Sequence, residues 1–144
     1  MAELVIVEEI DAPPEKTWEA LIDSAHQSEW MIATRVRGVG SDGNGLGAHR
    51  DAFTGVGPIG FLDTLVITQW EPPRRCVVKH TGTVVRGAGA FEVQALPDGR
   101  SRVILTEWVE LPLGVLGQVG WLLARPIARL FFRASLKRMA RDLA

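Results

Sequence analysis

The C-terminal stretch PIARLFFRASLKRMARDLA, residues 126–144, decides the fold, because its apolar and basic residues recur with the period of an α-helix. At about 100° per residue, one side of this helix is mostly apolar and consists of Ala128, Phe131, Phe132, Ser135, Leu136, Met139 and Leu143. The other side is basic and consists of Arg129, Arg133, Lys137 and Arg141. Leu130 falls on the basic side and departs from the pattern. An amphipathic helix needs a core to cover, so we expect this helix to pack on the preceding part of the chain.

The segment just before this helix, LGVLGQVGWLLA at 113–124, is apolar on all sides. A membrane-spanning helix needs about 20 mostly apolar residues, but Arg125, Arg129 and Arg133 follow at intervals of four. Pro126 suits the first turn of a new helix better than the middle of a span. We therefore expect no transmembrane segment. The segment 113–124 is instead expected to be buried, mobile or in contact with a ligand or partner.

Upstream of residue 113, the sequence pattern is mainly that of β-strands. ELVIVEEI at 3–10 predicts a strand, DAPPEKTWEALID at 11–23 predicts a helix, and SEWMIA at 28–33 predicts a short second helix capped by Ser28. Residues 34–111 consist of short β-rich runs separated by turn signals, which is typical of antiparallel strands. One strand, two helices, about six more strands and a long final helix predict an α+β domain, with a curved sheet wrapped on that helix.

Composition limits the class of protein. The 144 residues, 47% of them hydrophobic, predict a single domain over 1–144. The single Cys76 excludes a disulfide framework, and the N-terminus lacks the pattern of a secretion signal, so we expect a cytoplasmic protein. The net charge of −1 gives no bias toward nucleic acid, so we expect no nucleic-acid partner. The basic residues gather in 125–144, where six of them accompany the acid Asp142.

Neither the two glycine motifs nor the three histidines indicate a cofactor-binding or metal-binding site. GVGSDG at 38–43 and GVGPIG at 55–60 have the spacing of dinucleotide-binding loops, but β-rich runs follow them instead of a helix. These glycines are expected in hairpin turns. His26, His49 and His80 lack the spacing of metal ligands, and His26 is expected on the surface.

Three polar residues interrupt apolar strand faces and are the candidate catalytic residues. Strand alternation turns His80 toward the concave face of the sheet if Lys79 faces solvent. Asp63 and Glu107 lie among apolar residues of the same parity, where a carboxylate is costly unless it is paired or protonated. If they share a pocket, the two carboxyl groups could act as general acid and base.

Structural ion pairs are the more ordinary interpretation of these carboxylates, with Arg50, Arg86 or Arg102 as partners. A further pair, His49 and Asp51, shares strand parity with Phe53 and could lie in the pocket or at its rim, with Arg50 on the other face.

Several motifs together resemble a known family. They are DAPPEKTWEALID, the following Trp30, TQWEPPRR at 68–75, LPDGRSRVILTEW at 96–108 and the C-terminal helix. In this order they resemble the polyketide cyclase/dehydrase-like members of the START/Bet v 1-like (SRPBCC) superfamily, over essentially the whole chain. The resemblance implies a helix-grip fold, in which a seven-stranded antiparallel sheet curls around the C-terminal helix and leaves a cavity for a hydrophobic ligand. It implies no universal catalytic residues.

The side chains expected in this cavity or at its mouth are Trp30, Phe53, Leu65, Phe91, Val93, Trp108, Trp121, Phe131, Phe132 and Leu136. Ordinary core packing is the alternative for those on the final helix. The leading hypothesis is the binding of a hydrophobic small molecule, such as a lipid, polyketide or aromatic metabolite, without a cofactor. The alternatives are a cyclase/dehydrase-type enzyme and a module whose basic C-terminal helix contacts a partner or a membrane surface. The ligand and the oligomeric state are left open.

Overall fold

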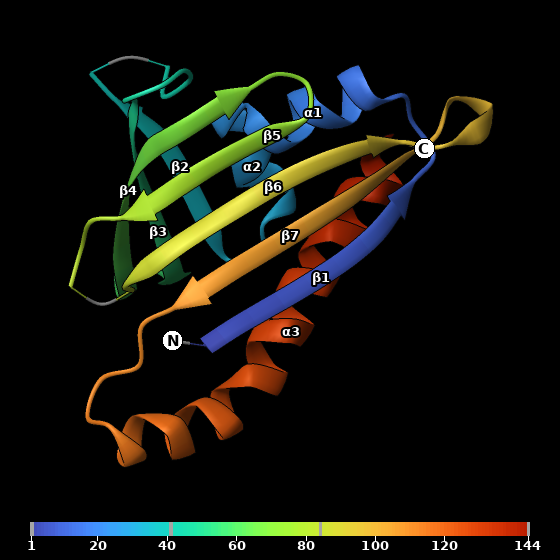
Figure 1. Ribbon diagram of the computed structural model, residues 1–144. Helices are drawn as coiled ribbons and strands as arrows, with labels where there is room; N and C mark the ends of the chain where they lie inside the picture. The colour runs from blue at the N-terminus through green and yellow to red at the C-terminus, as the bar shows by residue number, and fades with distance from the viewer. Residues whose placement is uncertain (1, 41, 84, 144) are drawn as a thin grey trace.

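Seven strands form one antiparallel sheet in the computed structural model, which describes residues 2–40, 42–83 and 85–143. The strands are β1 (Ala2–Ile10), β2 (Thr34–Val39), β3 (His49–Val56), β4 (Ile59–Glu71), β5 (Arg75–His80), β6 (Gly87–Ala95) and β7 (Ser101–Val109). Their order in the sheet is β1-β7-β6-β5-β4-β3-β2, so the first strand pairs with the last (Figure 1). Met1 and Ala144, the expected ends of the domain and of the final helix, lie outside the described residues.

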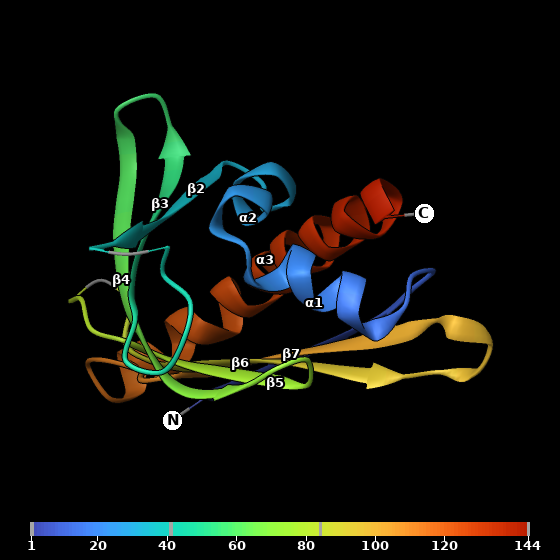
Figure 2. The ribbon, with the colours of Figure 1, turned by 90° about the horizontal axis from the view of Figure 1, so that it is seen from above.

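The helices all lie on one face of the sheet. They are α1 (Pro14–Ile22), α2 (Ser24–Trp30) and α3 (Val115–Leu143), and a short turn of 3₁₀ helix, Pro97–Gly99, joins β6 to β7. Seen from above, the strands β2 to β4 bend away from the plane of β5 to β7, and the helices lie inside this bend (Figure 2). This arrangement confirms the predicted α+β, helix-grip fold with its seven-stranded sheet and long C-terminal helix.

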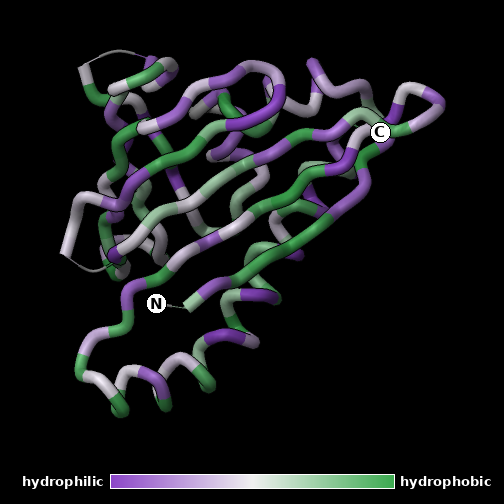
Figure 3. Tube along the Cα trace, in the orientation of Figure 1, coloured by the Kyte–Doolittle hydropathy of each residue, from purple (hydrophilic) through white to green (hydrophobic). Residues whose placement is uncertain are grey.

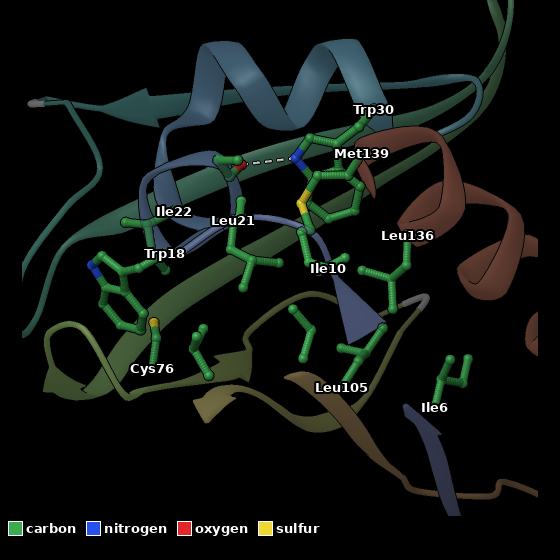
Figure 4. Packing of buried hydrophobic residues seen from close by; sticks show 14 of the residues in the cluster. Ile6, Ile10, Trp18, Leu21, Ile22, Trp30, Cys76, Leu105, Leu136 and Met139 are labelled. Carbon is green, nitrogen blue, oxygen red and sulfur yellow. Dashed lines mark hydrogen bonds between the residues drawn. The ribbon is translucent and has the colours of Figure 1, made fainter. Parts of the chain in front are cut away.

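The core forms where the concave face of the sheet meets the helices. Figure 4 shows buried side chains from the strands and from all three helices, among them Ile6, Ile10, Trp18, Leu21, Ile22, Trp30, Cys76, Leu105, Leu136 and Met139. The indole N–H of Trp30 donates to the carbonyl of Ala20 at 2.8 Å, so this ring is buried without an unpaired donor. Trp18 meets Trp70 edge to face, with 5.5 Å between ring centroids.

Helix α3 differs from its predicted form, because it is continuous from Val115 to Leu143 with Pro126 inside it. A proline removes one N–H donor and leaves the carbonyl four residues before it, that of Leu122, without its usual partner. Leu122 and Pro126 are both exposed, so water can reach this carbonyl. Most of the segment 113–124 therefore forms the first turns of this helix and is not a separate segment before it.

Ser28 is a second difference, because it lies inside α2 and does not cap it. Its Oγ accepts from the N–H of Val36 at 2.9 Å and donates to the Val36 carbonyl at 3.1 Å, which ties the helix to β2. Of the glycine motifs, Gly40 and Gly57 lie between strands as predicted, in the left-handed region at φ 75° and 59°, whereas Gly38, Gly55 and Gly60 lie within strands. Within the described residues, no helix has the length and hydropathy needed to cross a bilayer.

Candidate functional site

A pocket of about 650 Å³ lies between the concave face of the sheet and α3. Most of its walls are apolar, with Leu65 and Phe91 from the strands and Trp121, Phe131 and Phe132 from the helix. A small number of polar side chains from β3, β4, β5 and β7 interrupt this apolar surface. A pocket of this size and polarity is typical of sites for small organic ligands.

Three of the polar side chains form a hydrogen-bonded triad, which consists of Asp63 on β4, His80 on β5 and Glu107 on β7. The Nδ1 atom of His80 lies 2.9 Å from Oδ1 of Asp63. Its Nε2 atom lies 3.1 Å from Oε2 of Glu107. The three side chains are at most 16% exposed, so the pocket wall shields them from most of the solvent.

Two glycines on β6 make the triad possible. Strand β6 lies between β5 and β7, and its residues opposite His80 and Glu107 are Gly87 and Gly89. Because neither residue has a side chain, the imidazole can reach across β6 to the carboxylate. A Cβ atom on Gly89 would come within 2.8 Å of Oε1 of Glu107, closer than such contacts are found. The sequence GAG at 87–89 thus leaves the space in which His80 and Glu107 meet.

The triad holds a positively charged imidazole. Burial disfavours the charged ring, but the hydrogen bonds to Asp63 and Glu107, with their charges, outweigh it and raise the pKa of His80 to about 9. Both ring N–H groups then donate, one to each carboxyl group. Burial also raises the pKa of Glu107, and the hydrogen bond to His80 opposes this rise. The triad can therefore retain a proton at neutral pH inside an otherwise apolar pocket.

Arg50 on β3 is a second buried polar element of the pocket. Its guanidinium donates to the Gly43 carbonyl at 2.7 Å, to Oε1 of Gln27 at 2.8 Å and to the Ile22 carbonyl at 2.5 Å. It also donates to Oδ1 of Asn44. Burial lowers the pKa of Arg50. The side chain joins the end of α1, α2 and the loop between β2 and β3 at one edge of the pocket.

Comparison with protein families identifies the fold's relatives. The family model described as polyketide cyclase / dehydrase and lipid transport matches residues 1–144. The chain belongs to this family. The predicted resemblance is therefore confirmed.

Solved structures share the fold at low sequence identity. A protein from Thermus thermophilus is 18% identical with a TM-score of 0.79, and the match covers 99% of this chain and 97% of that one. XoxI from Bacillus cereus is 14% identical with a TM-score of 0.76, covering 99% and 96%. A protein from Mesorhizobium loti is 16% identical with a TM-score of 0.72, covering 97% and 98%. The comparison with curated proteins gave no match.

Within this family fold, the structure brings the three predicted catalytic residues together in the pocket. It places His80 on the concave face and gives both carboxylates a histidine as partner, where the ordinary interpretation expected Arg50, Arg86 or Arg102. The expected pairing of these carboxylates with Arg50 is therefore wrong. Arg50 donates to carbonyl and amide oxygens instead. The catalytic role of the triad stays a prediction.

Five of the ten predicted ligand-binding residues line the pocket: Leu65, Phe91, Trp121, Phe131 and Phe132. Three others are buried in the core outside it: Trp30, Val93 and Leu136. Phe53 and Trp108 are on the other face of the sheet. There Phe53 lies below the guanidinium of Arg35, and the Trp108 indole donates to Oε2 of Glu3 at 2.9 Å.

The sequence analysis turned the wrong face of β3 toward the pocket, and this error has a physical cause. His49, Asp51 and Phe53 share one parity, and the structure turns this parity away from the pocket, where Asp51 pairs with Arg37 at 3.4 Å. The other parity, with Arg50 and Ala52, lines the pocket. Sequence reasoning placed the arginine outside because a buried cation is costly, and its oxygen partners come from segments distant from β3. No pattern in the sequence around Arg50 predicts those partners.

Two further residues line the pocket although the sequence analysis did not assign them to it. Cys76 is buried in the pocket wall, and burial raises the pKa of its thiol to about 11, so it stays neutral. Its shared parity with His80 was the signal that places it there. Gln27 lines the pocket from α2 and reaches Arg50, and no sequence signal distinguished it from a surface glutamine.

Proposed function

We propose that this chain binds a hydrophobic small molecule in the pocket between the sheet and α3. The observation that carries the proposal is the pocket itself, which offers about 650 Å³ with apolar walls and one polar triad. The family description, with its polyketide cyclases, dehydrases and lipid transport, supports this class of ligand. A lipid, a polyketide or an aromatic metabolite would bury its apolar body here and direct a polar group toward Asp63 and Glu107.

Filling the pocket is expected to abolish binding. Ala128 on α3 lines the pocket, and Ala128→Trp puts an indole into the space that the ligand needs. We expect at least a tenfold weaker Kd for a neutral fluorescent probe such as Nile red, about 1.4 kcal/mol, measured by fluorescence titration. Mass spectrometry of extracts from purified wild-type protein then identifies any natural ligand that the pocket retains.

The matched control is Ala134→Trp, which adds the same ring to the same helix at an exposed position. This variant is expected to bind the probe as the wild type does. Equal affinity in Ala128→Trp and wild type, with both folded, would contradict binding in this pocket.

A second candidate function is acid–base catalysis on the bound molecule, and the triad favours it. Both His80 nitrogens are engaged, so the imidazole orients the carboxyl groups, and the reacting groups would be Glu107 as general acid and Asp63 as general base. Burial raises the pKa of Glu107, which suits this carboxyl group to act as an acid. The reaction class would be cyclisation, dehydration or hydration of a carbonyl compound.

Glu107→Gln tests this second function. We expect turnover of the molecule identified by extraction to fall about 100-fold, because the amide cannot release a proton, while its Kd changes by less than about threefold. The control is Glu110→Gln, an exposed carboxylate at the edge of the same pocket, which should leave turnover unchanged. Equal turnover in Glu107→Gln and wild type would leave ligand binding as the function.

The cellular location is part of the proposal. The single Cys76 cannot form a disulfide within the chain, which is consistent with the cytoplasmic location expected from the sequence. That location stays a prediction.

A further inference from the structure

The outer face of the first half of α3 is apolar and exposed. Four residues at helical spacing form this outer stripe: Leu116, Val119, Leu123 and Leu130. Each is between 51% and 73% exposed. The side of the helix that faces the pocket carries Trp121, Ala128 and Phe132 instead. Figure 3 shows hydrophobic positions recurring along these first turns of α3. A contiguous exposed apolar patch on a folded domain marks a surface that contacts a partner or a membrane.

Basic residues accompany the outer stripe without acidic ones. No Asp or Glu occurs from Leu111 to Arg141, a stretch with five arginines and one lysine. Arg133 is exposed beside the stripe, Arg141 is exposed farther along the same side, and neither forms an ion pair within the described residues. Farther along the helix, Lys137 lies 3.9 Å from Glu8. The combination of apolar and cationic side chains is complementary to an anionic lipid surface.

The same turns of α3 border the pocket. Ala124 and Ile127 line the pocket and are also exposed, as is Pro112 in the segment before the helix. A surface that held the outer stripe would therefore lie next to the opening of the pocket. A hydrophobic ligand would pass between that surface and the pocket over a short apolar path.

A second copy of the chain is a poorer occupant for this stripe. Two α3 helices packed through their outer stripes would bring Arg133 of both copies to the border of one interface, and neither helix has an acid in these turns. Like charges at close range oppose such a contact, whereas anionic lipid headgroups satisfy them.

We propose that α3 docks this protein on an anionic lipid bilayer. The helix lies in the plane of the interface, the outer stripe enters the boundary between headgroups and acyl chains, and Arg133 and Arg141 contact lipid phosphates. The docked protein presents its pocket to the membrane surface. This proposal requires no ligand in the pocket, so it stands or falls separately from the proposed binding function.

Vesicle flotation tests the docking. We expect the full chain to float with vesicles of phosphatidylcholine and phosphatidylglycerol at low salt, with at least about tenfold less binding to pure phosphatidylcholine and weaker binding at high salt. Leu123→Asp is expected to lower the partition coefficient at least about tenfold, because it puts a charge in the middle of the stripe. Charge reversal at Arg133 and Arg141 together is expected to have an effect of the same size.

The control variant is Leu46→Asp, which introduces the same charge at a leucine of nearly equal exposure, 73% against 72%, in the loop between β2 and β3. It should float as the wild type does. Ala128→Trp, which blocks the pocket, should float too, so failure of ligand binding is distinguished from failure of docking. No binding of the wild type to anionic vesicles at low salt would overturn the proposal. A dimer in solution that Leu123→Asp dissolves, or equal loss in Leu46→Asp and Leu123→Asp, would also overturn it.

Discussion

Replacing His80 with leucine is expected to lower the free energy of unfolding by about 3–5 kcal/mol at pH 7. The imidazolium holds Asp63 and Glu107 through two hydrogen bonds, and leucine leaves both carboxyl groups in the pocket wall without this partner. Urea denaturation of wild type and variant at pH 7 measures this loss.

The wild-type pH profile provides an independent check on the same group. The pKa of His80 is about 9 in the folded chain against 6.5 for an ordinary histidine, so folding increases its affinity for a proton. Its contribution to stability is fully present below pH 6.5 and is lost as the pH rises through 9. At about 1.4 kcal/mol per unit, the free energy of unfolding is expected to fall by about 3 kcal/mol across this interval. His80→Leu is expected to lack this slope.

His49→Leu is the matched control, since it removes an exposed histidine from β3, which is separated from β5 by β4. It should change the free energy of unfolding by less than about 0.5 kcal/mol. A His80→Leu variant as stable as His49→Leu would show that the triad is not charged as described.

Replacing Arg50 with methionine is expected to cost about 3–5 kcal/mol of unfolding free energy. Methionine has similar length but no donors, so the carbonyls of Ile22 and Gly43 and the Gln27 amide oxygen lose a charged partner in a buried place. The loop between β2 and β3 is then held less firmly, and its amides are expected to exchange with solvent faster. Urea denaturation and amide hydrogen exchange measure the two effects.

Arg37→Met is the control for this substitution. Arg37 lies on the adjacent strand β2, its side chain is 79% exposed, and its ion pair with Asp51 is long at 3.4 Å. Exposed pairs of this kind contribute less than about 1 kcal/mol, so this variant should be nearly as stable as wild type. Equal effects of the two substitutions would contradict the structural role assigned to Arg50.

The fold was predictable because local patterns and the family resemblance agreed. Residues 34–111 were predicted to form short strands, and the first of these, β2, begins at Thr34 as expected and ends at Val39. Helix α1 begins at the predicted prolines, with Pro13 before it and Pro14 in its first turn. The error at Pro126 came from treating a proline as the start of a helix. An exposed proline inside a long helix leaves its orphan carbonyl to water, and sequence alone does not reveal that exposure.

The candidate site was predictable only on strands where one residue showed which side of the strand faces solvent. Lys79 on the outside fixed His80 on the inside, and apolar neighbours of the same parity gave Asp63 and Glu107. On β3 this reasoning failed, because Arg50 is buried by contacts with α1, α2 and a loop. The triad also depends on glycines of β6 opposite His80 and Glu107, and this register appears only once strands far apart in sequence are paired.

The pairing of the first strand with the last also shapes how the chain is made. β1 has β7 as its neighbour in the sheet, so its residues Ala2–Ile10 must wait for Ser101–Val109 before they can form their ladder. On a ribosome, this apolar N-terminal strand emerges with most of the chain still to be synthesised. Closing such a long loop is slow, and the sheet is therefore expected to be completed only after Ser101–Val109 has left the ribosome.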